Sequence, residues 1–158
     1  MSPELHTYTQ ELRWILDQIS RTVDGLTEQQ LNWRPSTGTA NSAYVIASHV
    51  VGSTRVYALG FGCGQTVTRD RSAEFATSGS SSQDLVIALG QLADEITTAL
   101  ATLAPATLDE CLWPTRELWG TGQVREISRR EALVESIRHA ALHLDELRLT
   151  RDLARQGV

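Results

Sequence analysis

Hydrophobic residues recur at three- and four-residue spacing along four long stretches of the chain, and this period predicts four amphipathic helices. The first is expected over residues 3–23, because Ser2 can cap a helix that has Pro3 at its first position. The other three are expected over residues 41–59, 82–103 and 128–154. Four helices of this length predict an all-α fold, a four-helix bundle.

Two long connections interrupt this pattern. Residues 60–82 are rich in glycine and serine and show no period, and residues 104–127 contain two tryptophans and two prolines. We expect a short hairpin in the second connection, around residues 120–123. Connections of this length favour crossovers rather than a simple up-and-down bundle, and long connections in compact domains often carry function.

Length and composition predict one soluble domain over residues 1–158. A chain of 158 residues with 41% hydrophobic residues suits a single core. Polar residues break every apolar stretch before it approaches the roughly 20 residues that a bilayer span needs. The first residues also lack the basic and apolar regions of a secretory signal, so we expect a cytoplasmic protein without a membrane partner.

The charged residues and cysteines exclude several classes of function. A formal net charge of -5 leaves no basic face for a phosphate backbone, which argues against a nucleic-acid partner. All 14 cationic residues are arginines, so chemistry that needs a lysine, such as a Schiff base or a Walker phosphate loop, is excluded. Cys63 and Cys111 form no CxxC pair, and we expect free thiols.

The histidines are the candidate chemistry of the chain. His139 and His143 are four residues apart on a predicted helix, only about 40° apart around its axis, so both rings can reach one metal ion. Ala140 stands where the glutamate of an HExxH zinc protease would be, so that class fails. The alternative is a chance pair on a solvated face. His49 lies on the apolar side of its helix, where it could instead be an ordinary core histidine, and His6 is expected at the surface.

Three segments of the chain together resemble a known family. They are LTEQQLNWRP at residues 26–35, the stretch from Asn41 that ends in Ser48-His49, and HAALHLDE at residues 139–146. This combination resembles the DinB-like superfamily, which includes YfiT-type thiol transferases, mycothiol-dependent maleylpyruvate isomerases and the metal-binding part of ergothioneine synthases. The resemblance implies a bundle in which one histidine of the second helix and a His-x3-His pair of the fourth bind nickel, zinc or iron. Those positions fall on His49, His139 and His143.

One departure from the family concerns the residues after the second histidine of the pair. Relatives often carry His-x-Gly-Gln, whereas this chain has Leu144-Asp145-Glu146. Glu146 lies three residues beyond His143 on the same helix face. It could accept a hydrogen bond from an imidazole, act as a fourth ligand, or serve as a catalytic general base; the alternative is a solvated glutamate.

Three imidazoles would leave a divalent ion with open coordination positions, as in catalytic sites. The resemblance implies an enzyme that transfers a low-molecular-weight thiol to a small-molecule substrate. Candidates for the substrate pocket come from the two connections; they are Trp113, Trp119, Arg69 and Arg71. The tryptophans could instead close one end of the bundle.

Two other functions stay open on the sequence. A metal-dependent hydrolase would use Glu146 or a metal-bound hydroxide for proton transfer. A non-catalytic bundle would use the ion only to tie two helices together or to sense metal. The apolar stripes also allow a homodimer, and the sequence does not fix whether they pack within the chain or against a second copy.

Overall fold

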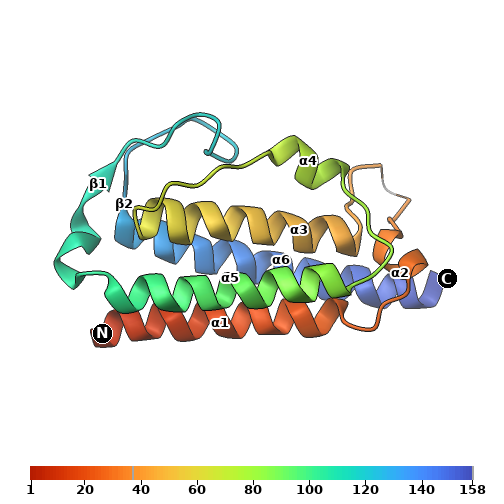
Figure 1. Cartoon of the computed structure of the whole chain (residues 1–158). Helices are drawn as coiled ribbons and strands as arrows, with labels where there is room; N and C mark the ends of the chain where they lie inside the picture. Colours follow the sequence, from red (N-terminus) through yellow and green to blue (C-terminus); the bar gives the residue numbers. More distant parts are fainter. Residues whose placement is uncertain (37, 158) are drawn as a thin grey trace.

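Four long helices form the computed structural model, which describes residues 1–36 and 38–157 (Figure 1). They are α1 (Pro3–Val23), α3 (Ala43–Thr54), α5 (Gln83–Thr102) and α6 (Arg129–Gly157). The predicted all-α bundle is confirmed. Pro35 and Gly38 predict a loop over residues 33–38. Thr37 of this loop and Val158, the last residue of the predicted domain, lie outside the described residues.

Side-chain caps determine where these helices begin. The Ser2 hydroxyl accepts a hydrogen bond from the Leu5 amide at 3.3 Å, as predicted for α1. The Ser-x-x-Glu spacing of Ser128 and Glu131 predicts a capping box, and these two residues exchange hydrogen bonds of 3.0 and 3.1 Å at the start of α6. The sequence offers Asn41 as the cap of α3, but the cap is Ser42, so this helix begins one residue later than predicted. The Thr-x-x-Gln spacing of Thr27 and Gln30 predicts a second capping box, which is present and opens a short helix, α2 (Glu28–Asn32).

The direction of the helices explains the long connections. Figure 1 shows α3 and α5 running the same way, opposite to α1 and α6. Residues 63–82 therefore travel back along the bundle before α5 begins, as the predicted crossover requires. The sequence indicated no structure in this segment, yet it contains a short helix, α4 (Arg71–Ala76), which lies over α3 (Figure 1).

Helix α3 does not stop near residue 59 as expected but continues as a π-helix, η1 (Arg55–Gly62). The Cys63 amide donates to the Ala58 carbonyl, five residues earlier, at 2.9 Å. The wider turn presents Tyr57 and Phe61 to Trp119 of the second connection, with ring centroids 6.1 and 6.4 Å away. These aromatic contacts hold the connection against the bundle.

The second connection has its paired strands at its ends. After a 3₁₀ turn, η2 (Pro105–Asp109), strand β1 (Cys111–Leu112) pairs antiparallel with β2 (Ile127–Ser128). The hairpin expected around residues 120–123 is therefore placed wrongly. Gly122, with a φ of +83°, gives a turn there, but the residues around it bury no apolar side chain that could stabilise paired strands, whereas Ile127 is buried.

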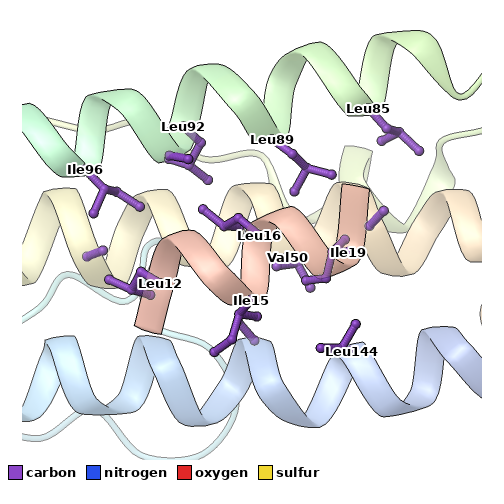
Figure 2. Packing of buried hydrophobic residues seen from close by; sticks show 14 of the residues in the cluster. Leu12, Ile15, Leu16, Ile19, Val50, Leu85, Leu89, Leu92, Ile96 and Leu144 are labelled. Carbon is purple, nitrogen blue, oxygen red and sulfur yellow. The ribbon is translucent and has the colours of Figure 1, made fainter. Parts of the chain in front are cut away.

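The core lies along the axis of the bundle. Side chains of α1 interleave with the leucines of α5, and residues of α3 and α6 close the other side (Figure 2). By length and composition α5 is the one helix among the described residues that could cross a membrane. Its apolar face is nevertheless buried in this cluster, as in the core helix of a soluble protein, and consists of Leu85, Leu89, Leu92, Ile96 and Leu100.

Two leucines of α6 provide a test of this core. Leu147 is fully buried and Leu149 is 63% exposed. We expect Leu147→Ala to lower the free energy of unfolding by about 2–5 kcal/mol, because it removes buried apolar surface and leaves a cavity. The matched variant Leu149→Ala should change it by less than about 0.5 kcal/mol. Chemical denaturation measures both, and equal losses would contradict this description of the core.

Candidate metal centre

Three of the four histidines meet between α3 and α6. His49, in the middle of α3, is 5% exposed, and His139 and His143 lie half-buried on consecutive turns of α6. Their ring centroids are 4.5 to 5.2 Å apart. One ligand nitrogen from each ring lies within 4.8 Å of the others, so the group could hold a metal ion. His6 is exposed on α1, as expected.

Each ring has an oxygen partner at Nδ1. The partner of His49 is Glu74 Oε2 at 2.9 Å, and that of His143 is Glu146 Oε2 at 2.7 Å. His139 Nδ1 lies 3.3 Å from the hydroxyl of Ser53, which itself donates to the Val50 carbonyl and so accepts from the ring. Arg69 Nη2 also lies 3.2 Å from His49 Nδ1, but the Glu74 oxygen is closer, so a proton on Nδ1 suits all three rings and leaves Nε2 of each imidazole as the atom with a free lone pair.

The partner of His49 belongs to a buried ion pair. Arg69 donates to both oxygens of Glu74, each at 2.7 Å, and its side chain is 2% exposed. Burial raises the pKa of Glu74, but hydrogen bonds from Arg69 and His49 outweigh this effect, and the pKa lies below its usual value. The carboxylate therefore stays ionised and can orient the imidazole.

A glycine makes room for this carboxylate. Gly52 lies one turn after His49 on α3, and a Cβ there would come within 1.9 Å of Glu74 Oε1. The absence of a side chain at this position lets α4 set Glu74 directly against α3.

Glu74 is the residue that sequence reasoning missed. It lies in the connection without a hydrophobic period, on a helix of six residues that has no buried residue of its own. The available signal was Asp70, whose side chain caps the helix by accepting from the Ala73 amide at 2.9 Å. A cap of this kind indicates a helix start, but not that the helix would lie over His49.

The ring of His139 is held neutral by its surroundings. The pKa of His139 is lowered to about 3, mainly by burial and to a smaller extent by the neighbouring His143 and His49. At neutral pH its Nε2 is thus unprotonated, as a metal ligand must be. The hydrogen bond from His143 is the main reason that the pKa of Glu146 lies below its usual value. Of the three roles considered for Glu146, its geometry matches the acceptor of an imidazole hydrogen bond.

A cavity of about 360 Å³ adjoins two of the histidines, His49 and His139. Of the four pocket residues predicted from the sequence, Arg69, Arg71 and Trp119 line it. Trp113 does not, since it lies 68% exposed just beyond β1. The remaining wall includes residues that the sequence did not single out; they are Tyr57, Arg125, Glu135 and Arg138.

Comparison with known proteins agrees with the resemblance noted in the sequence. The family model of the DinB superfamily matches residues 11–147. Among solved structures, the chain is similar to a DinB-like protein of Bacillus subtilis, YjoA, with a TM-score of 0.62 and 16% sequence identity over 96% of this chain and 90% of the other. At this identity the similarity concerns the fold. No curated protein matches the chain.

The histidine cluster predicts a specific metal content. We expect the native chain, purified without chelators, to carry close to one divalent ion and His139→Ala to carry far less, because one of three ligands is gone. His6→Ala, which removes the exposed fourth histidine, is the matched control and should keep the native content. Elemental analysis measures the metal content of all three proteins. Equal metal in the native chain and His139→Ala would show that these histidines do not form the metal site.

Glu74 gives a second prediction. We expect Glu74→Gln to fold and to bind the metal about 10- to 100-fold more weakly, because the imidazole of His49 loses its charged acceptor. Glu95→Gln is the control, since Glu95 pairs with Arg55 on the surface in the same way. Competition with a chelator of known affinity measures the change. Unaltered affinity in Glu74→Gln would show that the carboxylate does not support the site.

Proposed function

The chain belongs to the DinB superfamily, and on this basis we propose that His49, His139 and His143 bind a divalent metal ion through Nε2 and that the protein is a metal-dependent thiol transferase. The proposal rests on one observation. In each of the three rings Nδ1 has an oxygen partner, so Nε2 is the nitrogen that can bind a metal ion. Zinc, nickel and iron are the expected ions, since all three accept imidazole ligands.

The residues around the site have distinct tasks in this proposal. Glu74, Ser53 and Glu146 fix the orientation of the rings, and Arg69 balances the charge of Glu74. A divalent ion bound by these three imidazoles would have open positions and would lower the pKa of a thiol or water bound there toward neutral pH. The cavity beside His49 and His139 gives the second substrate a place next to those positions.

The contacts of the carboxylates argue against a hydrolase that relies on a carboxylate as its general base. A hydrolase would benefit from a carboxylate that is free to act as a general base. Glu146 is engaged by His143, and its lowered pKa makes it a weak base. Glu135, on the cavity wall, is held by Arg138 through hydrogen bonds of 2.9 and 2.5 Å. A thiolate nucleophile needs no such base once it has formed.

The cavity also supports an enzyme over a purely structural metal site. Structural zinc sites are closed and have four protein ligands. Here three imidazoles converge, and two of them border an open space.

Thiol transfer predicts an activity that depends on the histidines. We expect the metal-loaded chain to accelerate the reaction of a low-molecular-weight thiol with chlorodinitrobenzene, in which a carbon–sulfur bond forms, chloride leaves and the thiol proton passes to solvent. His143→Ala should keep its helical content and lose at least about 100-fold in rate. The measurements are absorbance of the thioether product across a panel of thiols and circular dichroism. Equal rates in both proteins, or hydrolysis of an ester by the native chain without any thiol, would contradict the proposal.

A further inference from the structure

The cavity beside the histidines has an unusual charge. Four arginines line it against a single glutamate, although the chain as a whole has a formal net charge of -5. An electropositive recess on an acidic protein attracts anions selectively, and low-dielectric walls strengthen the effect. A divalent ion on the imidazoles would add to this positive charge.

Three of the four arginines already have carboxylate partners. Arg69 pairs with Glu74, Arg138 with Glu135, and Arg125 with Glu131 at 3.3 Å. The carboxylates of these pairs neutralise much of the positive charge of the three arginines.

Arg71 is the exception. Among residues 1–36 and 38–157 it has no carboxylate partner and its side chain makes no hydrogen bond, and its Nε is buried without an acceptor. A buried donor left unpaired costs free energy, so the side chain of Arg71 would be stabilised by a hydrogen-bond acceptor on a bound ligand.

The position of Arg71 is fixed by aromatic packing. Its guanidinium carbon lies 4.9 Å from the centre of the Phe75 ring, and Phe75 in turn lies 4.8 Å from the ring of His49. Stacking on an aromatic face restricts the guanidinium without using its N–H groups. Arg71 thus contacts Phe75, which in turn contacts His49, and its N–H groups make no hydrogen bond to the described residues.

From these contacts we infer that Arg71 binds an anionic oxygen group of the substrate, a carboxylate or a phosphate, and positions the rest of the molecule beside the histidines. A guanidinium matches both groups through two parallel hydrogen bonds. The cavity volume of about 360 Å³ restricts the ligand to a small molecule. This inference names the substrate class for the proposed function and rests on it, but anion binding can be measured on its own.

The test is calorimetric binding of two probes, maleate and inorganic phosphate, to the native chain and to Arg71→Gln, with and without bound metal. We expect the native chain to bind at least one probe, and Arg71→Gln to bind it at least about tenfold more weakly at unchanged metal content. The stronger probe identifies the anionic group. Dimethyl maleate, which has the same carbon skeleton without charge, should not distinguish the two proteins.

Arg155→Gln is the matched control, since it removes the same charge from the exposed end of α6. It should bind both probes like the native chain. Equal affinities in the native chain and Arg71→Gln, or an equal loss in Arg155→Gln, would overturn the inference. If the native chain held no metal and still bound an anion through Arg71, the proposed function would fail while the inference stood.

Discussion

Three imidazole rings from two helices share one small volume, and the need to satisfy their nitrogens governs the rest of the site. Each buried N–H requires an acceptor, because an unpaired polar group away from water is costly. Ser53 of α3 is the acceptor for His139, and Glu146 of α6 is the acceptor for His143. The acceptor for His49 is Glu74, which lies outside the four long helices. The crossover is thus part of the site and not only a link between helices.

The bundle supplies the rigidity that such a site needs. His49 and the pair on α6 are fixed by helices whose apolar faces pack along the core. The π-helical continuation of α3 adds to this arrangement, because its wider turn directs Tyr57 and Phe61 toward Trp119. In this way the wall of the cavity is tied to the same helix that carries His49.

The sequence predicted the parts of this structure that depend on periodic patterns. The four helices, two capping boxes and the shared face of His139 and His143 all follow from spacing along one element. The approach of His49 to that pair involves two helices, and it came from the family resemblance. Glu74 and the strands at residues 111–112 and 127–128 were not foreseen, because short elements in a connection are stabilised by contacts that no local pattern encodes. The same reason explains why Arg69, Arg71 and Trp119 reach the cavity and Trp113 does not.

The site draws its parts from the long helices and from the connections between them. The imidazoles belong to helices whose sequence is constrained by the core, and Arg69 and Glu74 of the first connection support His49, whereas Arg71 lines the cavity and pairs with none of these residues. Substitutions at Arg71 can therefore alter which molecules enter the cavity and leave the nitrogen donors in place. Such a separation would allow one bundle to acquire new specificities during evolution without passing through unfolded intermediates.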